Sequence, residues 1–251
     1  MSPNDGPGSS DYQPRFYRDA MVSSDLASFH VVQAETDLFV SAPSDLSVIA
    51  QVAVAACRAE IEGFLAAQPL FATTLQPLAV PESASAIIRA MAAAGQAAGV
   101  GPMAAVAGAT AEYVGRELLK HTDQVIVENG GDIFIVTTQP RVIAVYAGAS
   151  PLSDKFALAV RPESTPLGIC TSSGTVGHSK SFGNADAAVV LSPDTALADA
   201  WATAIGNLVH SVDDVEKAVY AAQNAPGVTG ALVIKDDKMA AWGDIEIEPL
   251  M

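Results

Sequence analysis

Short apolar or alternating runs along the chain predict strands, and apolar residues at helical spacing predict helices. The predicted strands are residues 12–22, 29–32, 36–40, 124–129, 132–138, 141–147, 155–160, 186–191, 230–235 and 239–247. The predicted helices are residues 44–67, 83–98 or 85–98, a segment from about 103, 192–207 and 212–224. Ser44 and Ser192 are the candidate N-caps of the first and fourth helices, and Pro193 suits the first position of the fourth.

The order of these elements predicts an α+β fold. Strands and helices do not alternate regularly, which disfavours a doubly wound parallel sheet. Strand-strand-helix-helix blocks recur at roughly 28–120 and 124–223, and Gly130–Gly131 is the clearest hairpin turn. We expect residues 1–11 to form a disordered tail and residues 12–251 to form a single domain, because no long linker divides the chain.

The stretch from Gly168 to Asn207 carries the most unusual composition. Its first half is rich in glycine and hydroxyl residues, which can present backbone N–H groups to an anion or ligand. Asp199 and Thr203 lie four residues apart on the following helix and so share one face, an arrangement that suits a hard cation such as Mg²⁺. The alternative interpretation is an ordinary loop followed by a solvated helix face.

Composition narrows the classes of function. The formal net charge is −15 and the sequence pI is about 4.4, which argues against a nucleic-acid partner. Two cysteines are too few for a disulfide framework; Cys57 is expected to be buried, and Cys170 is a candidate thiol beside the hydroxyl run. With no secretion signal and no uninterrupted apolar span, we expect a cytoplasmic protein without membrane insertion.

Four motifs together resemble an uncharacterised bacterial and archaeal family of ApbE-like proteins, which is distantly similar to the ApbE-type FAD:protein FMN transferases. The motifs are GVGPMAAVAGATAEYVG, VIVENGGDIFI, GICTSSGTVGHSKSFGNADAAVVL and ADAWATAIGN. The closer resemblance covers nearly the whole chain after residue 12. It implies a T-fold-like α+β architecture with an antiparallel sheet and packed helices, often dimeric.

The resemblance also implies site residues. In the ApbE enzymes the Asp and Thr of the last motif hold Mg²⁺ together with a backbone carbonyl of the small-residue helix; the corresponding positions here are Asp199, Thr203 and Ala107. Two motifs correspond to the nucleotide-binding segments and give the expected FAD-contacting residues Asn129, Gly130, Gly131, Asp132, Thr171, Ser172, Ser173, Gly174 and Thr175. His178 corresponds to the loop histidine and is the candidate general base, since an unperturbed imidazole titrates near neutrality.

Two departures from the ApbE pattern bear on activity. The stretch Val106–Ala109 lacks the lysine of the family's G-[IA]-A-K-G pattern, and the proline-containing run expected after the histidine is absent. Three hypotheses therefore stay open: an Mg²⁺-dependent flavin or nucleotide transferase with an acceptor protein, a flavin- or nucleotide-binding protein without catalysis, and a structural subunit whose site is vestigial.

Overall fold

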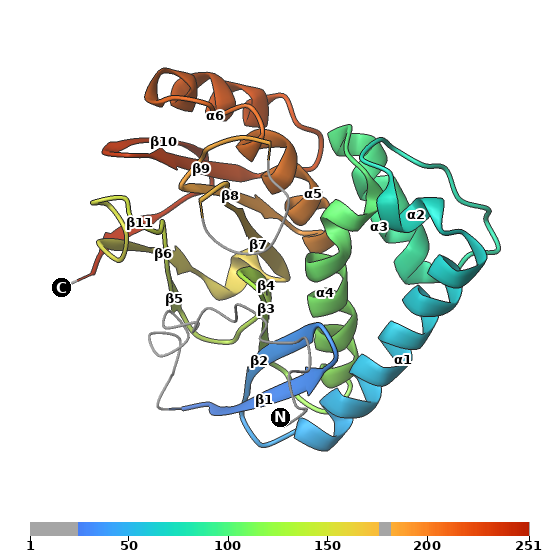
Figure 1. Ribbon diagram of the computed structural model, residues 1–251. Coiled ribbons are helices and arrows are strands. Elements are labelled where there is room, and N and C mark those ends of the chain that lie inside the picture. The colour runs from blue at the N-terminus through green and yellow to red at the C-terminus, as the bar shows by residue number, and fades with distance from the viewer. Residues whose placement is uncertain (1–24, 176–181, 251) are drawn as a thin grey trace, which may run out of the picture.

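A computed structural model describes residues 25–175 and 182–250 (Figure 1). The predicted strand 12–22 and the candidate base His178 lie outside the described residues. The division into a tail of residues 1–11 and one domain of residues 12–251 stays a prediction.

The chain forms two sheets and a set of helices on one side of the larger sheet (Figure 1). The strands are β1 (Ala27–Gln33), β2 (Thr36–Ala42), β3 (Val125–Asn129), β4 (Asp132–Val136), β5 (Arg141–Ala144), β6 (Phe156–Val160), β7 (Leu167–Ser172), β8 (Ala187–Ser192), β9 (Gly230–Lys235), β10 (Lys238–Gly243) and β11 (Ile247–Pro249). The helices are α1 (Ser47–Ala67), α2 (Leu70–Thr73), α3 (Ala86–Ala98), α4 (Val106–Leu118), α5 (Thr195–Gly206) and α6 (Val215–Gln223).

The larger sheet contains eight strands in the order β1-β2-β3-β4-β7-β8-β9-β10, and the smaller sheet has the order β11-β6-β5. Every strand pair among the described residues is antiparallel. The predicted α+β class, with an antiparallel sheet and packed helices, is confirmed.

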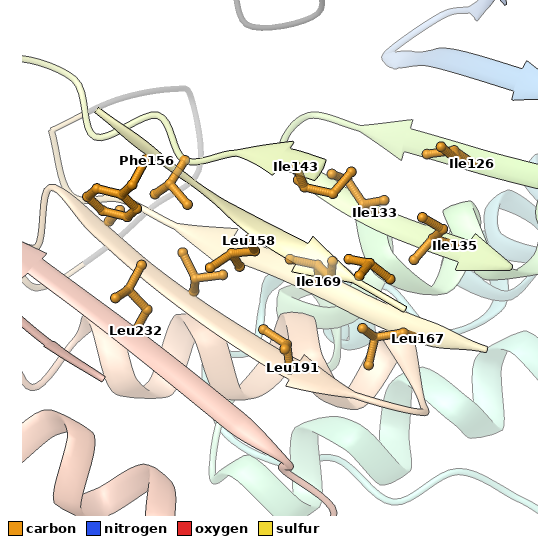
Figure 2. Packing of buried hydrophobic residues seen from close by; sticks show 14 of the residues in the cluster. Ile126, Ile133, Ile135, Ile143, Phe156, Leu158, Leu167, Ile169, Leu191 and Leu232 are labelled. Atoms are coloured by element: carbon orange, nitrogen blue, oxygen red, sulfur yellow. The ribbon is translucent and has the colours of Figure 1, made fainter. Parts of the chain in front are cut away.

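The larger sheet buries both of its faces. Its first face packs against the small sheet through branched aliphatic side chains, several of which are visible in Figure 2. Ile133 and Ile169 belong to that layer, and Phe156 and Leu158 meet them from the small sheet. Its second face packs against the helices, chiefly through alanine and valine. Small side chains on that second face allow the helices to approach the strands closely.

The order of elements around the larger sheet repeats. A strand pair, a group of helices and a second strand pair form β1 to β4, and the same order recurs from β7 to β10. The recurrent blocks therefore cover residues 27–136 and 167–243. Each ends one strand pair later than predicted, and the second begins at β7 rather than at β3, which belongs to the first block. Residues 137–166 connect the blocks and supply β5 and β6.

Two predicted helix starts are wrong. The residue that precedes α1 is Leu46 rather than Ser44, and the Asp45 carboxylate accepts a hydrogen bond from the Ser47 N–H at 2.8 Å. Ser192 ends β8, whereas Asp194 caps α5 by accepting from the Leu197 N–H at 2.9 Å. In both cases an aspartate one or two residues further along the chain accepts a hydrogen bond from an amide group of the first turn.

Two segments differ from the predicted pattern of strands and helices: the strand β7, which was not predicted, and the short helix α2. The hydroxyl run begins inside the sheet, because β7 continues through Thr171 and Ser172. The segment that follows α1 contains the short helix α2, and Phe71 inside it is fully buried.

Among the described residues no single helix has the length and apolar composition to cross a membrane, and one bent pair, Ala86–Ala98 with Pro102–Leu118, meets those criteria only jointly.

Helix α4 lies against the sheet at Gly115. A Cβ atom added there would come within 2.2 Å of the Phe134 ring, which is fully buried. Gly63, near the end of α1, has no atom within 4 Å of the same hypothetical position. The close contact between α4 and β4 therefore requires glycine, whereas α1 tolerates a larger residue.

We expect Gly115→Ala to lower the free energy of unfolding by about 1–3 kcal/mol through overpacking. Gly63→Ala should instead raise it by up to about 1 kcal/mol, because alanine is the better helix former and the site is open. Urea denaturation of both variants provides the comparison, and equal effects would contradict the assigned packing of α4.

Candidate functional site

Three hydrogen bonds join the four segments that the sequence singled out. The Asn129 side-chain amide donates to the Ala107 carbonyl at 3.1 Å, which connects the β3–β4 hairpin to α4. The Gly108 N–H donates to Asp199 Oδ2 at 2.8 Å, which connects α4 to α5. The Thr171 N–H donates to Asp132 Oδ1 at 3.2 Å, which connects β7 to the same hairpin. Segments spread over 93 positions, Ala107 to Asp199, thus meet at one place.

Gly108 allows α4 and α5 to approach each other at this place. A Cβ atom there would lie 2.5 Å from the Thr195 carbonyl oxygen and 2.9 Å from Asp199 Cβ. A second contact of the same kind lies beside it, because Glu112 Oε2 accepts from the Thr195 N–H at 2.8 Å. Each helix therefore supplies a carboxylate to an N–H group in the first turn of the other helix, where the helix dipole favours negative charge.

Neither Gly108 nor Glu112 was among the predicted site residues. Glycine within a run of alanines indicated close packing, but nothing in the sequence identified α5 as the neighbour. Glu112 lies within the first quoted motif, but nothing in the sequence connected it to its partner Thr195, which is 83 residues away.

Asp199 does not lie on a solvated helix face. Its residue exposure is only 9%, and Thr203, one turn later on α5, is half-buried. With the Ala107 carbonyl they offer a carboxylate, a hydroxyl and a backbone oxygen, and these donor types suit Mg²⁺. Within the described part of the chain, no group of three or more His, Cys, Asp and Glu side chains is arranged to hold a metal ion. Any Mg²⁺ site here would therefore depend on neutral oxygens beside at most two carboxylates.

Two buried carboxyls at this place affect each other's ionisation. Burial raises the pKa of Asp199 to about 7, although the N–H groups of Gly108 and Ala107 favour its ionised form. Burial also raises the pKa of Asp132 well above its ordinary range, and the negative charge of Asp199 raises it further. Burial and the repulsion between the two carboxylates therefore favour a proton on the pair.

Cys170 is unsuited to act as a nucleophile in this environment. Its side chain is fully buried, and the Sγ atom donates to the Thr195 carbonyl at 3.4 Å. Burial raises the pKa of the thiol, and the charges of Asp132 and Asp199 raise it further. Since the thiolate is the reactive form, the thiol stays neutral and unreactive here.

The hydroxyl segment from Thr171 to Thr175 makes many internal hydrogen bonds. The Gly174 N–H donates to the Ala185 carbonyl, and the Thr175 N–H donates to Ser173 Oγ at 3.1 Å. The Thr175 hydroxyl donates to Asp186 at 3.1 Å. Together with Thr171, three of these five residues use their N–H groups within the protein, which weakens the expectation of a backbone phosphate cradle.

The hairpin tip has the geometry that its glycines predict. Gly130 and Gly131 have φ of +69° and +103°, which L side chains rarely adopt, and the turn lies between β3 and β4. The Gly131 N–H donates to Glu128 Oε1 at 2.8 Å, so this amide is also engaged. Asn129 and Asp132 face each other across the turn and hold α4 and β7 through the bonds described above.

Comparison with known proteins gives the family. A family model described as AbpE bacteria matches residues 19–239. The chain belongs to this family. The UPF0280 protein of Methanocella arvoryzae is 46% identical over 190 residues, which cover 74% of this chain and 76% of that protein. The UPF0280 protein of Methanothrix thermoacetophila is 43% identical over 199 residues, which cover 78% and 83%.

Solved structures agree with the fold of the AbpE family member described here. The flavin transferase ApbE from Vibrio cholerae matches with a TM-score of 0.59 at 13% identity, covering 87% of this chain and 97% of that one. The apo flavinyl transferase ApbE from Pseudomonas stutzeri matches with a TM-score of 0.56 at 14% identity, covering 87% and 94%. At these identities the likeness establishes the ApbE fold, and the predicted resemblance to an ApbE-like family is confirmed.

The carboxyl pair predicts how stability depends on pH. Asp132 and Asp199 bind protons more tightly in the folded protein than in the unfolded chain, where their pKa would be near 4. Their contribution to stability is therefore fully present below about pH 4 and is lost as pH rises through about 7. Asp132→Asn removes one charge and keeps an acceptor for the Thr171 N–H.

We expect the variant Asp132→Asn to lose less stability than the wild type between pH 5 and pH 8, by on the order of 1–3 kcal/mol. Chemical denaturation at both pH values measures the difference. Asp213→Asn, at an exposed position outside the site, serves as the control and should keep the wild-type pH dependence. The same pH dependence in Asp132→Asn and wild type would contradict the coupling.

Proposed function

We propose that this protein carries out Mg²⁺-dependent chemistry on the pyrophosphate of FAD or a related nucleotide, with flavin transfer to an acceptor protein as the reaction. The observation that supports it most is that hydrogen bonds bring Asp199 and the Ala107 carbonyl together beside the β3–β4 hairpin, with Thr203 one turn after Asp199 on α5. The flavin transferases of Vibrio cholerae and Pseudomonas stutzeri share the fold, which supports a flavin as the nucleotide.

In the proposed reaction an acceptor hydroxyl oxygen attacks the phosphorus on the FMN side of the pyrophosphate. The new P–O bond forms as the bond between that phosphorus and the bridging oxygen breaks. AMP leaves with the bridging oxygen, and the hydroxyl proton passes to a base, for which His178 is the candidate. Bound Mg²⁺ would neutralise the charge that develops on the phosphate oxygens.

The residues of this chain have distinct proposed roles. Asp199 would supply the charged ligand, and Thr203 and the Ala107 carbonyl would supply neutral ligands. Asn129 would orient the Ala107 carbonyl through its side-chain amide rather than bind the nucleotide. Gly130, Gly131, Asp132, Thr171, Ser172, Ser173, Gly174 and Thr175 remain the candidate nucleotide-binding positions.

A second candidate function is flavin or nucleotide binding without catalysis. Two observations favour it: the absence of a lysine in Val106–Ala109, and the internal use of amide groups in Thr171–Thr175. Both functions share the metal and the ligand, so they differ only in whether the pyrophosphate is cleaved.

Calorimetric titration of FAD with and without Mg²⁺ tests metal-dependent ligand binding, which both candidate functions require. Asp199→Asn keeps an oxygen that accepts from the Gly108 N–H but removes the charge. We therefore expect it to weaken Mg²⁺-dependent binding of FAD by a factor of about 10–100. Thr203→Val preserves shape and should weaken binding by a smaller factor. Asp194→Asn, at the exposed N-cap of the same helix, is the matched control and should bind as the wild type does.

Equal affinity in wild type and Asp199→Asn, with unchanged melting temperatures, would remove the support for a metal site. Absence of any stabilisation by flavins or nucleotides would favour the structural subunit with a vestigial site.

Incubation with FAD and Mg²⁺ separates the two functions. Only the transferase cleaves the pyrophosphate, so chromatography should detect AMP, and mass spectrometry of an added acceptor should detect FMN. Bound, intact FAD after prolonged incubation would favour the binding protein.

A further inference from the structure

Helix α1 exposes an apolar face along its whole length. Val48 and Val52 are the most exposed large apolar residues in the described chain, at 73% and 68%. Ala55, Ala59, Gly63 and Ala66 continue the same stripe and are exposed as well. The spacing of three and four residues places all six on one side of the helix, opposite the buried residues Ala50, Ala53, Val54, Cys57 and Ile61.

The stripe has bulky residues at one end and small residues at the other. Its valines lie in the first two turns, and its residues in the second half are alanine and glycine. In an antiparallel pair centred at residue 57, Val48 of one copy lies opposite Ala66 of the other, and Val52 lies opposite Gly63 to within one residue. The face is therefore complementary in shape to itself under a two-fold rotation.

The charges of α1 agree with the same arrangement. All three, Arg58, Glu60 and Glu62, lie in its second half, and residues 47–57 carry none. A parallel pair would place each glutamate against its own copy, whereas an antiparallel pair places Glu62 near the uncharged residue Val52. The antiparallel arrangement also sets the N-terminus of each helix beside the C-terminus of the other, which the helix dipoles favour.

We propose that a second copy of this chain covers the exposed face of α1, through an antiparallel, two-fold α1–α1 contact. A chain with a net charge of −15 repels its own copies, and this uncharged face allows two of them to approach. The 21 residues of α1 span only about 31 Å, so the contact belongs to the small class of interfaces below about 1,200 Å². The dimer is therefore reversible, and it does not depend on the proposed chemistry.

Sedimentation velocity of the full chain, from low-micromolar to millimolar concentration, tests the proposal. We expect a monomer–dimer equilibrium in the wild type, and Val52→Glu should raise its dissociation constant at least about 10-fold because a charge would be buried without a partner. Tyr220→Glu is the matched control: Tyr220 is 66% exposed on α6, which lies far from α1 (Figure 1), and the equilibrium should not change.

Disulfide trapping tests the register. Val48 and Ala66 are about 27 Å apart along one helix, so thiols at both positions cannot bond within a chain. The double variant Val48→Cys/Ala66→Cys should form a covalent dimer on oxidation, and each single variant should form much less. The native Cys57 and Cys170 are both buried. A wild type that stays monomeric throughout, a dimer unaffected by Val52→Glu, or equal trapping in single and double variants would overturn the proposal.

Discussion

The contact between α4 and α5 determines the arrangement of this site. Asp199 on α5 accepts from the Gly108 N–H on α4, and Glu112 on α4 accepts from the Thr195 N–H on α5. In each helix the donor and the carboxylate are four residues apart, so the two bonds form a reciprocal pair. This exchange satisfies amide groups that a helix start would otherwise leave without partners, and it fixes the two helices at the distance that Gly108 permits.

That contact also sets the charge of the site. Asp199 is buried beside Asp132, and the cost of burying two negative charges favours a proton on the pair. A bound divalent cation would replace this proton, since it stabilises the ionised forms that burial opposes. The same buried carboxyls also raise the pKa of Cys170, which keeps its thiol neutral.

Local patterns predicted most elements but not their neighbours. Gly130–Gly131 between two apolar runs and the apolar run Ala187–Leu191 have signals within a few residues, and both were confirmed. Both N-caps were placed two residues too early: Leu46 precedes α1 and Asp194 caps α5, whereas the serines upstream carried the stronger local signal. The strand β7 was missed altogether, since the glycine and hydroxyl residues around it carry no alternating apolar signal.

The site residues could be recognised only from contacts between segments that are far apart in the sequence. Helical spacing places Asp199 and Thr203 on one face, but only the packing of Gly108 against α5 shows that this face is covered. Asn129 fitted a nucleotide-binding motif, yet its amide donates to Ala107, 22 residues earlier. The repeated order of strand pairs and helices in β1–β4 and β7–β10 divides the site between two units. Ala107, Asn129 and Asp132 come from the first unit, whereas Thr171, Asp199 and Thr203 come from the second. Each unit therefore contributes only half of this constellation, so neither could form the site without the other.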